Sequence, residues 1–205
     1  MREIWLHVEG GGNSTQKERL RQGFGAFLGT LQDRARARGV RIRLTFWGPR
    51  SETYVAFARS LRQNPAILHL LLVDSEGPVS SAPRHHLAAS DAWELAGISD
   101  DQCHLMVEVM ESWFLADPEA LAAFYGQGFA VNALPKTRDV EQIAKATVMS
   151  SLARATRDSQ KREYHKTHHA PLILARLDVG KVRGRAQHCD RLFATIEQQL
   201  AGGTT

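Results

Sequence analysis

The sequence predicts an α/β protein with a mainly parallel central sheet flanked by helices and a C-terminal helical part. Short strand-like runs at residues 4–8, 41–46 and 66–73 alternate with longer segments of helical periodicity. Residues 66–73 (AILHLLLV) are nearly all apolar, which is typical of a strand covered by helices on both faces. Strands and helices that alternate in this way are joined by right-handed crossovers, so their strands lie parallel.

One long helix is expected between the first two strands. Apolar side chains recur at helical spacing over residues 20–35, Thr15 and Glu18 form a capping-box pattern, and Gly39 suits a helix C-terminus. A later helix is expected to start at Asp117, a capping side chain that precedes a proline. The other expected elements are a strand at residues 103–109 and helices at residues 54–61, 140–152 and 185–200.

The length of 205 residues suits one domain. We expect a core over residues 1–135 and a basic helical part over residues 136–205 that packs on the same domain. The two cysteines, Cys103 and Cys189, are too few for a disulfide framework or a zinc site. No apolar run is long enough to span a bilayer, and residues 1–8 lack the features of a signal peptide, so we expect a cytoplasmic protein.

Basic residues gather in two segments, although the net charge is only +4. Residues 34–62 contain eight arginines and one acidic residue, Glu52. Residues 136–191 contain thirteen lysines and arginines against six acidic residues. This distribution suits a metal-dependent enzyme that acts on a polyanion such as nucleic acid. The alternative is that both segments are solvated helical faces without a ligand, and charge alone does not decide between the two.

Three carboxylates follow strands of the expected sheet. Glu9 comes directly after the first strand and Asp74 after the third, and the carboxyl ends of parallel strands share one edge. Glu76 lies two residues beyond Asp74, so in an extended stretch both side chains would share a face. Mg²⁺ prefers oxygen ligands of this kind, and Mn²⁺ is the alternative ion. The sequence therefore predicts a metal site formed by Glu9, Asp74 and Glu76, against the alternative of ordinary turn residues and caps.

A glycine-rich turn follows Glu9. Gly10 and Gly11 leave the backbone open to a phosphate or a metal ion, and Asn13 lies in the same turn. The helix that follows points its free N–H groups at the same place. We therefore expect Gly10, Gly11 and Asn13 to contact the bound cofactor.

These motifs resemble the Toprim domain of topoisomerases, primases and OLD-type nucleases. The resemblance rests on Glu9-Gly10 after the first strand and on Asp74 and Glu76 after a later one, where Glu76 replaces the second Asp of the Toprim signature. Residues 107–121 and 164–178 further resemble compact, uncharacterised bacterial Toprim-related proteins that often accompany an ATPase in phage-defence neighbourhoods. The resemblance implies Mg²⁺ chemistry on nucleic acid and an ATPase partner encoded nearby.

Two further residues are candidates for catalysis. Glu111 lies in an otherwise apolar stretch, and because a buried charge must be paired or bound, either a salt bridge or a role as ligand of a second ion would explain it. The resemblance favours the site. Lys166 lies among His165, His168 and His169, where it could stabilise charge on a phosphoryl group. The alternative for this cluster is an exposed basic loop.

Three functions remain open from the sequence. The first is a metal-dependent nuclease that uses Glu9, Asp74, Glu76, Glu111 and Lys166. The second is a catalytically silent subunit of an ATPase complex, since the chain contains no P-loop pattern of its own. The third is a site for a small phosphorylated metabolite. No membrane partner is expected, and the oligomeric state stays open.

Overall fold

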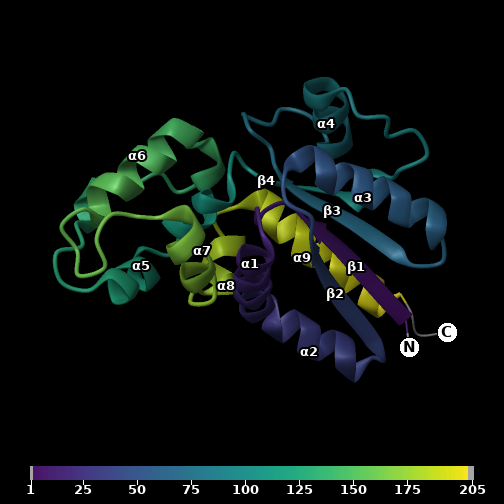
Figure 1. Cartoon of the computed structure of the whole chain (residues 1–205), viewed down its shortest axis with the longest axis horizontal. Coiled ribbons are helices and arrows are strands. Elements are labelled where there is room, and N and C mark those ends of the chain that lie inside the picture. The colour runs from purple at the N-terminus through teal and green to yellow at the C-terminus, as the bar shows by residue number, and fades with distance from the viewer. Residues whose placement is uncertain (1, 203–205) are drawn as a thin grey trace.

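The computed structural model describes residues 2–202 and contains a four-stranded, all-parallel sheet flanked by helices (Figure 1). The strand order is β2-β1-β3-β4. The strands are β1 (Arg2–Val8), β2 (Val40–Phe46), β3 (Leu68–Asp74) and β4 (Cys103–Met106). This architecture confirms the α/β fold class with its central parallel sheet. The fourth strand ends at Met106, three residues before the end expected from the sequence.

The register aligns the carboxyl ends of the three leading strands. Val8 of β1 pairs with Phe46 of β2 on one side and with Leu72 of β3 on the other. Asp74 of β3 in turn pairs with Met106 of β4. The segments that follow β1, β2 and β3 therefore emerge at one edge of the sheet, where open parallel sheets carry their sites.

Helices cover both faces of the sheet (Figure 1). The apolar cluster on one face contains Leu6 of β1, Phe24 and Ile196, and the cluster on the other contains Phe57, Leu71 and Leu87. Both faces of β3 are buried, which explains why this strand is almost entirely apolar. The helices are α1 (Ser14–Phe27), α2 (Gly29–Ala37), α3 (Arg50–Gln63), α4 (Pro83–Asp91), α5 (Pro118–Tyr125), α6 (Lys145–Thr156), α7 (Lys166–Leu174), α8 (Val179–Arg183) and α9 (Gln187–Ala201), with short 3₁₀ turns at Asp100–Gln102, Met110–Ala116, Val131–Ala133 and Val140–Gln142.

The long helix expected after β1 is two helices, because α1 ends at Phe27 and α2 begins at Gly29, with Leu28 between them. The predicted capping box of Thr15 and Glu18 is also wrong. Asn13 is the N-cap instead, and its side chain accepts a hydrogen bond from Gln16 N at 2.9 Å. The Gln16 side chain in turn accepts from Gly12 N at 2.8 Å. This pair satisfies the amides of Gly12 and Gln16 and places the cap two residues earlier than predicted.

Segments from both halves of the chain build the same core. Leu192 and Ile196 of α9 are completely buried in the cluster that contains Leu6. Arg191 of α9 also donates to the Cys103 carbonyl of β4 at 2.8 Å. Within residues 2–202, no helix has the length and apolar character needed to cross a membrane.

α7 packs closely on α1 at a glycine. A Cβ atom on Gly23 would lie 2.6 Å from the Pro171 carbonyl oxygen, whereas one on Gly25 would meet nothing within 4 Å. Gly23 therefore sets the distance between the two helices.

We expect Gly23→Ala to lower the free energy of unfolding by about 1–3 kcal/mol, because an added methyl group forces the helices apart. Gly25→Ala is the matched control, and removal of a helical glycine should leave stability unchanged or raise it by up to about 1 kcal/mol. Urea unfolding of both variants checks this, and equal stabilities would contradict the close contact.

Candidate functional site

The ends of β1 and β3 bring three carboxylates together. One oxygen each of Glu9, Asp74 and Glu76 lies within 4.8 Å of the other two. These are the three residues that the sequence predicts as metal ligands. Their separation is short enough for one cation to bridge them.

Glu9 is fixed by backbone contacts to β3. Its amide donates to the Leu72 carbonyl at 3.0 Å, and its Oε2 accepts from Asp74 N at 3.1 Å. Burial raises the pKa of Glu9, although the nearby Arg50 guanidinium opposes the shift. The Glu9 side chain is therefore oriented before any ligand binds.

Asp74 is the most buried of the three acids, with 6% of its surface exposed. Its Oδ1 accepts from Met110 N at 2.8 Å. Burial raises its pKa to about 8, and the carboxylates of Glu9 and Glu111 add to the shift while Lys166 opposes it. The ionised form of Asp74 thus lacks sufficient positive charge around it.

The backbone conformation that places Glu76 beside the other two acids differs from the one expected. Glu76 has a backbone φ of 61°, so residues 74–76 turn and do not continue as the extended stretch assumed from the sequence. Its amide donates to the Glu108 carbonyl at 3.0 Å, which holds the turn. The Glu76 carboxylate forms an ion pair with Lys145 at the start of α6.

Arg50 is a neighbour of the site that the sequence did not single out. Its guanidinium makes two hydrogen bonds of 2.7 Å to Asp91, and it also donates to the Asp74 carbonyl oxygen. Its distance to Glu9 Oε2 is 3.7 Å. Asp91 therefore takes most of the bonding capacity of Arg50, and Glu9 stays available to a ligand. Only the position of Arg50 shortly after β2 could have drawn attention to it.

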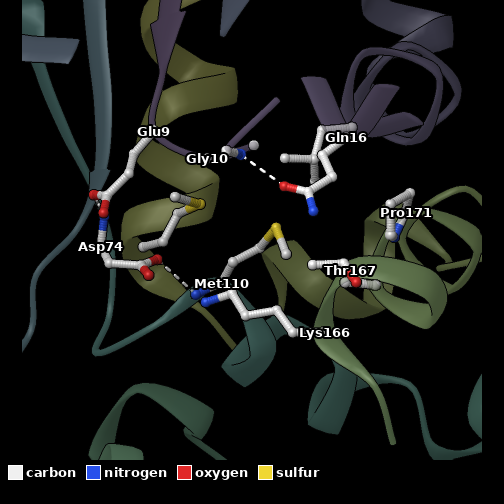
Figure 2. Close-up of a pocket in the computed structure, with 13 residues that line it drawn as sticks. Glu9, Gly10, Gln16, Asp74, Met110, Lys166, Thr167 and Pro171 are labelled. Atoms are coloured by element: carbon white, nitrogen blue, oxygen red, sulfur yellow. Dashed lines mark hydrogen bonds between the residues drawn. The ribbon is translucent and has the colours of Figure 1, made fainter. Parts of the chain in front are cut away.

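A cavity of about 190 Å³ opens beside the acids (Figure 2). Glu9 and Asp74 lie on one side of it, and Lys166 extends toward Asp74 from the other. The starts of α1 and α7 both border this space through Gln16 and Thr167. The remaining lining residues are Gly10, Gly11, Gly12, Leu20, Met106, Met110, Ala170 and Pro171.

The glycine turn lies where the sequence predicts it. Gly10 and Gly11 have φ of 130° and 78°, conformations that side chains disfavour, and both border the cavity. A Cβ on Gly10 would lie 2.9 Å from the Leu20 side chain. Asn13 does not border the cavity, since its side chain caps α1. The turn therefore presents backbone atoms to the cavity, and the predicted contact of the Asn13 side chain with a ligand there is wrong.

Glu111 lies behind Lys166 and does not border the cavity. It is fully buried, and its Oε1 accepts from the Tyr164 hydroxyl at 2.8 Å and lies 3.3 Å from Lys166 Nζ. Burial opposes the charge of Lys166, but Glu111 and Asp74 outweigh it and raise the Lys166 pKa. Burial and Glu111 also raise the pKa of Tyr164, which keeps its hydroxyl a donor. Glu111 thus positions Lys166.

The acids fit a hard divalent cation. Within residues 2–202, Glu9 Oε1, Asp74 Oδ2 and Glu76 Oε1 accept no hydrogen bond from the protein. Oxygen donors alone suit Mg²⁺ or Mn²⁺. A cation among them would also supply the positive charge that the buried Asp74 lacks. Glu76 would have to exchange Lys145 for the ion.

The histidine cluster lies outside the acid site. His169 Nδ1 lies 3.1 Å from the Tyr125 hydroxyl and accepts from His165 N at 3.2 Å. His168 contacts Arg19 of α1 at 3.2 Å. None of the three histidines borders the cavity that contains Asp74.

Comparison with known proteins identifies the family of this chain. The family described as "Domain of unknown function (DUF4276)" matches residues 8–197, so the chain belongs to that family. No curated protein and no solved structure shows a significant match to the sequence.

We expect Asp74→Asn to stabilise the metal-free protein at alkaline pH. Because the folded-state pKa of Asp74 is raised from 3.8 to about 8, its favourable contribution is complete below pH 4 and is lost as pH rises through 8. The variant should therefore gain about 1 kcal/mol or more over the wild type at pH 9 in EDTA, but not at pH 4.5. Urea unfolding at both pH values measures the difference.

Mg²⁺ should favour the wild type over Asp74→Asn, the opposite of the effect expected in EDTA. It should raise the melting temperature of the wild type at pH 8 and leave that of Asp74→Asn unchanged, because a ligand stabilises only the protein that binds it. An equal response of both proteins would show that the acids do not bind the ion.

Proposed function

For this member of the DUF4276 family, we propose a Mg²⁺-dependent phosphoryl-transfer activity that hydrolyses phosphodiester bonds of nucleic acid. The observation that carries the proposal is the convergence of Glu9, Asp74 and Glu76 beside a cavity whose opposite wall holds Lys166. Carboxylates that suit a metal ion thus face a lysine that suits a phosphate across one small cavity. The Toprim-like spacing of the acids supports the same activity.

The three acids would hold the ion. Within residues 2–202, one carboxylate oxygen each of Glu9 and Asp74 accepts no hydrogen bond from the protein, and backbone amides fix the other oxygen of each. A bound Mg²⁺ supplies charge stabilisation for the phosphodiester and lowers the pKa of a bound water. The chain's contribution is a preformed pair of oxygen ligands that need little rearrangement.

The opposite wall would bind the phosphate. Lys166 donates from its ammonium group, and Glu111 and Tyr164 fix its position from behind. The helices α1 and α7 begin beside the cavity, and the free N–H groups of their first turns favour an anion there. Gly11 has no side chain and leaves its backbone open to a phosphate oxygen, whereas the Gly10 amide already donates to the Gly48 carbonyl at 2.9 Å.

A second candidate is a small phosphorylated metabolite, which the limited volume of about 190 Å³ favours. A nucleotide or sugar phosphate that raised the melting temperature in the presence of Mg²⁺ more than an oligonucleotide does would select this candidate.

We expect the wild type to cleave a labelled oligonucleotide in the presence of Mg²⁺ or Mn²⁺ and to be inactive in EDTA. Asp74→Asn and Glu9→Gln should each lower the rate at least about 100-fold, because loss of even an outer-sphere partner typically costs 10- to 100-fold. Gel analysis of the products measures the rates.

Glu119→Gln is the matched control, since Glu119 is an exposed acid that pairs with Lys181. It should cleave at the wild-type rate. Metal-dependent cleavage that persists at equal rate in Asp74→Asn would assign the activity to another site or to a contaminant.

A further inference from the structure

A second concave surface follows the outer side of the contact between α1 and α7. We call it the α1–α7 groove, and its volume is about 730 Å³. It shares Pro171 with the cavity at the acid site, so the two spaces meet at the same helix pair. Its lining residues are Arg19, Gln22, Gly23, Phe124, Lys161, His168, His169, Pro171, Leu172 and Ala175.

The α1–α7 groove is basic and is not compensated by acids. Arg19, Lys161, His168 and His169 line it, and no carboxylate of residues 2–202 does. Neither Arg19 nor Lys161 forms an ion pair with any residue between 2 and 202. By contrast, Arg21 on the same helix is paired with Glu18. The positive charge in the groove is therefore available to a ligand.

The basic groups are held in place across the groove. Arg19 of α1 and His168 of α7 bridge the two helices at 3.2 Å. Lys161 Nζ lies 5.1 Å from the centre of the Phe124 ring. Burial lowers the pKa of His169, and the neighbouring charges of His165, His168 and Lys161 add to the shift.

We propose that the α1–α7 groove binds the sugar-phosphate backbone of a single nucleic-acid strand and leads it to the acid site. The proposal rests on the proposed function and names its substrate. A basic groove that follows a backbone is the common device of proteins that bind single strands. A duplex fits poorly, because Asp74 is 6% exposed beside a cavity of about 190 Å³ and a rigid double helix cannot deliver one phosphate there.

The test measures binding without catalysis. Fluorescence anisotropy in EDTA follows a labelled single strand of about 12 nucleotides, within the usual site size of such grooves. The double variant Arg19→Gln, Lys161→Gln should bind about 10-fold more weakly than the wild type. The slope of log binding constant against log salt concentration should be shallower by about 1.4 for this variant, because each lost phosphate contact removes about 0.7 from the slope.

The matched control is Arg59→Gln, Arg62→Gln, which removes two exposed charges from α3 and should bind like the wild type. The wild type should also prefer the single strand over a duplex of the same length. Equal loss of affinity in both double variants, unchanged binding in the groove variant, or a preference for duplex would each overturn the proposal.

The experiments distinguish an error in the proposed strand binding by the groove from an error in the proposed hydrolytic function. If the groove variant loses binding but the wild type cleaves nothing with Mg²⁺, the groove stands and the hydrolytic function is wrong. If the wild type cleaves and the groove variant binds and cleaves normally, the site stands and the substrate path is wrong. Thermal melting confirms that both variants fold, as expected for exposed side chains.

Discussion

The parallel register between β1 and β3 is the constraint on which the rest of the site depends. Val8, the last residue of β1, is aligned with Leu72, so Glu9 lies beside the end of β3, and the Asp74 amide donates to the Glu9 carboxylate. A shift of one residue would turn one of the two acids to the other face of the sheet. The buried apolar side chains of both strands exclude such a shift, and the core of the protein thereby fixes the distance between its acids.

Burial of the acids carries a cost in stability. Asp74 has a raised pKa because desolvation exceeds the stabilisation that Lys166 and Met110 N provide. Arg50 is present but is largely bound by Asp91. A domain optimised for stability alone would place an apolar or neutral residue at this position. An acid kept without full compensation is typical of a site that awaits a positively charged ligand.

The sequence was sufficient for features set by local pattern. Strand periodicity, the Asp117 cap of α5 and the grouping of Glu9 with Asp74 depend on short segments and on a general rule for parallel sheets. Features set by long-range contacts could not be predicted. The turn at Glu76, the hydrogen bonds between Arg50 and Asp91 and the pairing of the buried Glu111 with Lys166 join segments that only tertiary packing brings together. The start of α1 was misplaced because two capping patterns overlap.

The position of α9 has a consequence for synthesis. Leu192 and Ile196 complete the core beneath β1, so the face of the sheet that they cover stays exposed to water while the ribosome translates the preceding residues. A nascent chain in this state carries an uncovered apolar surface on parallel strands, which form slowly and aggregate readily. Chaperone protection of the nascent chain therefore becomes important until Gln187–Ala201 leaves the exit tunnel.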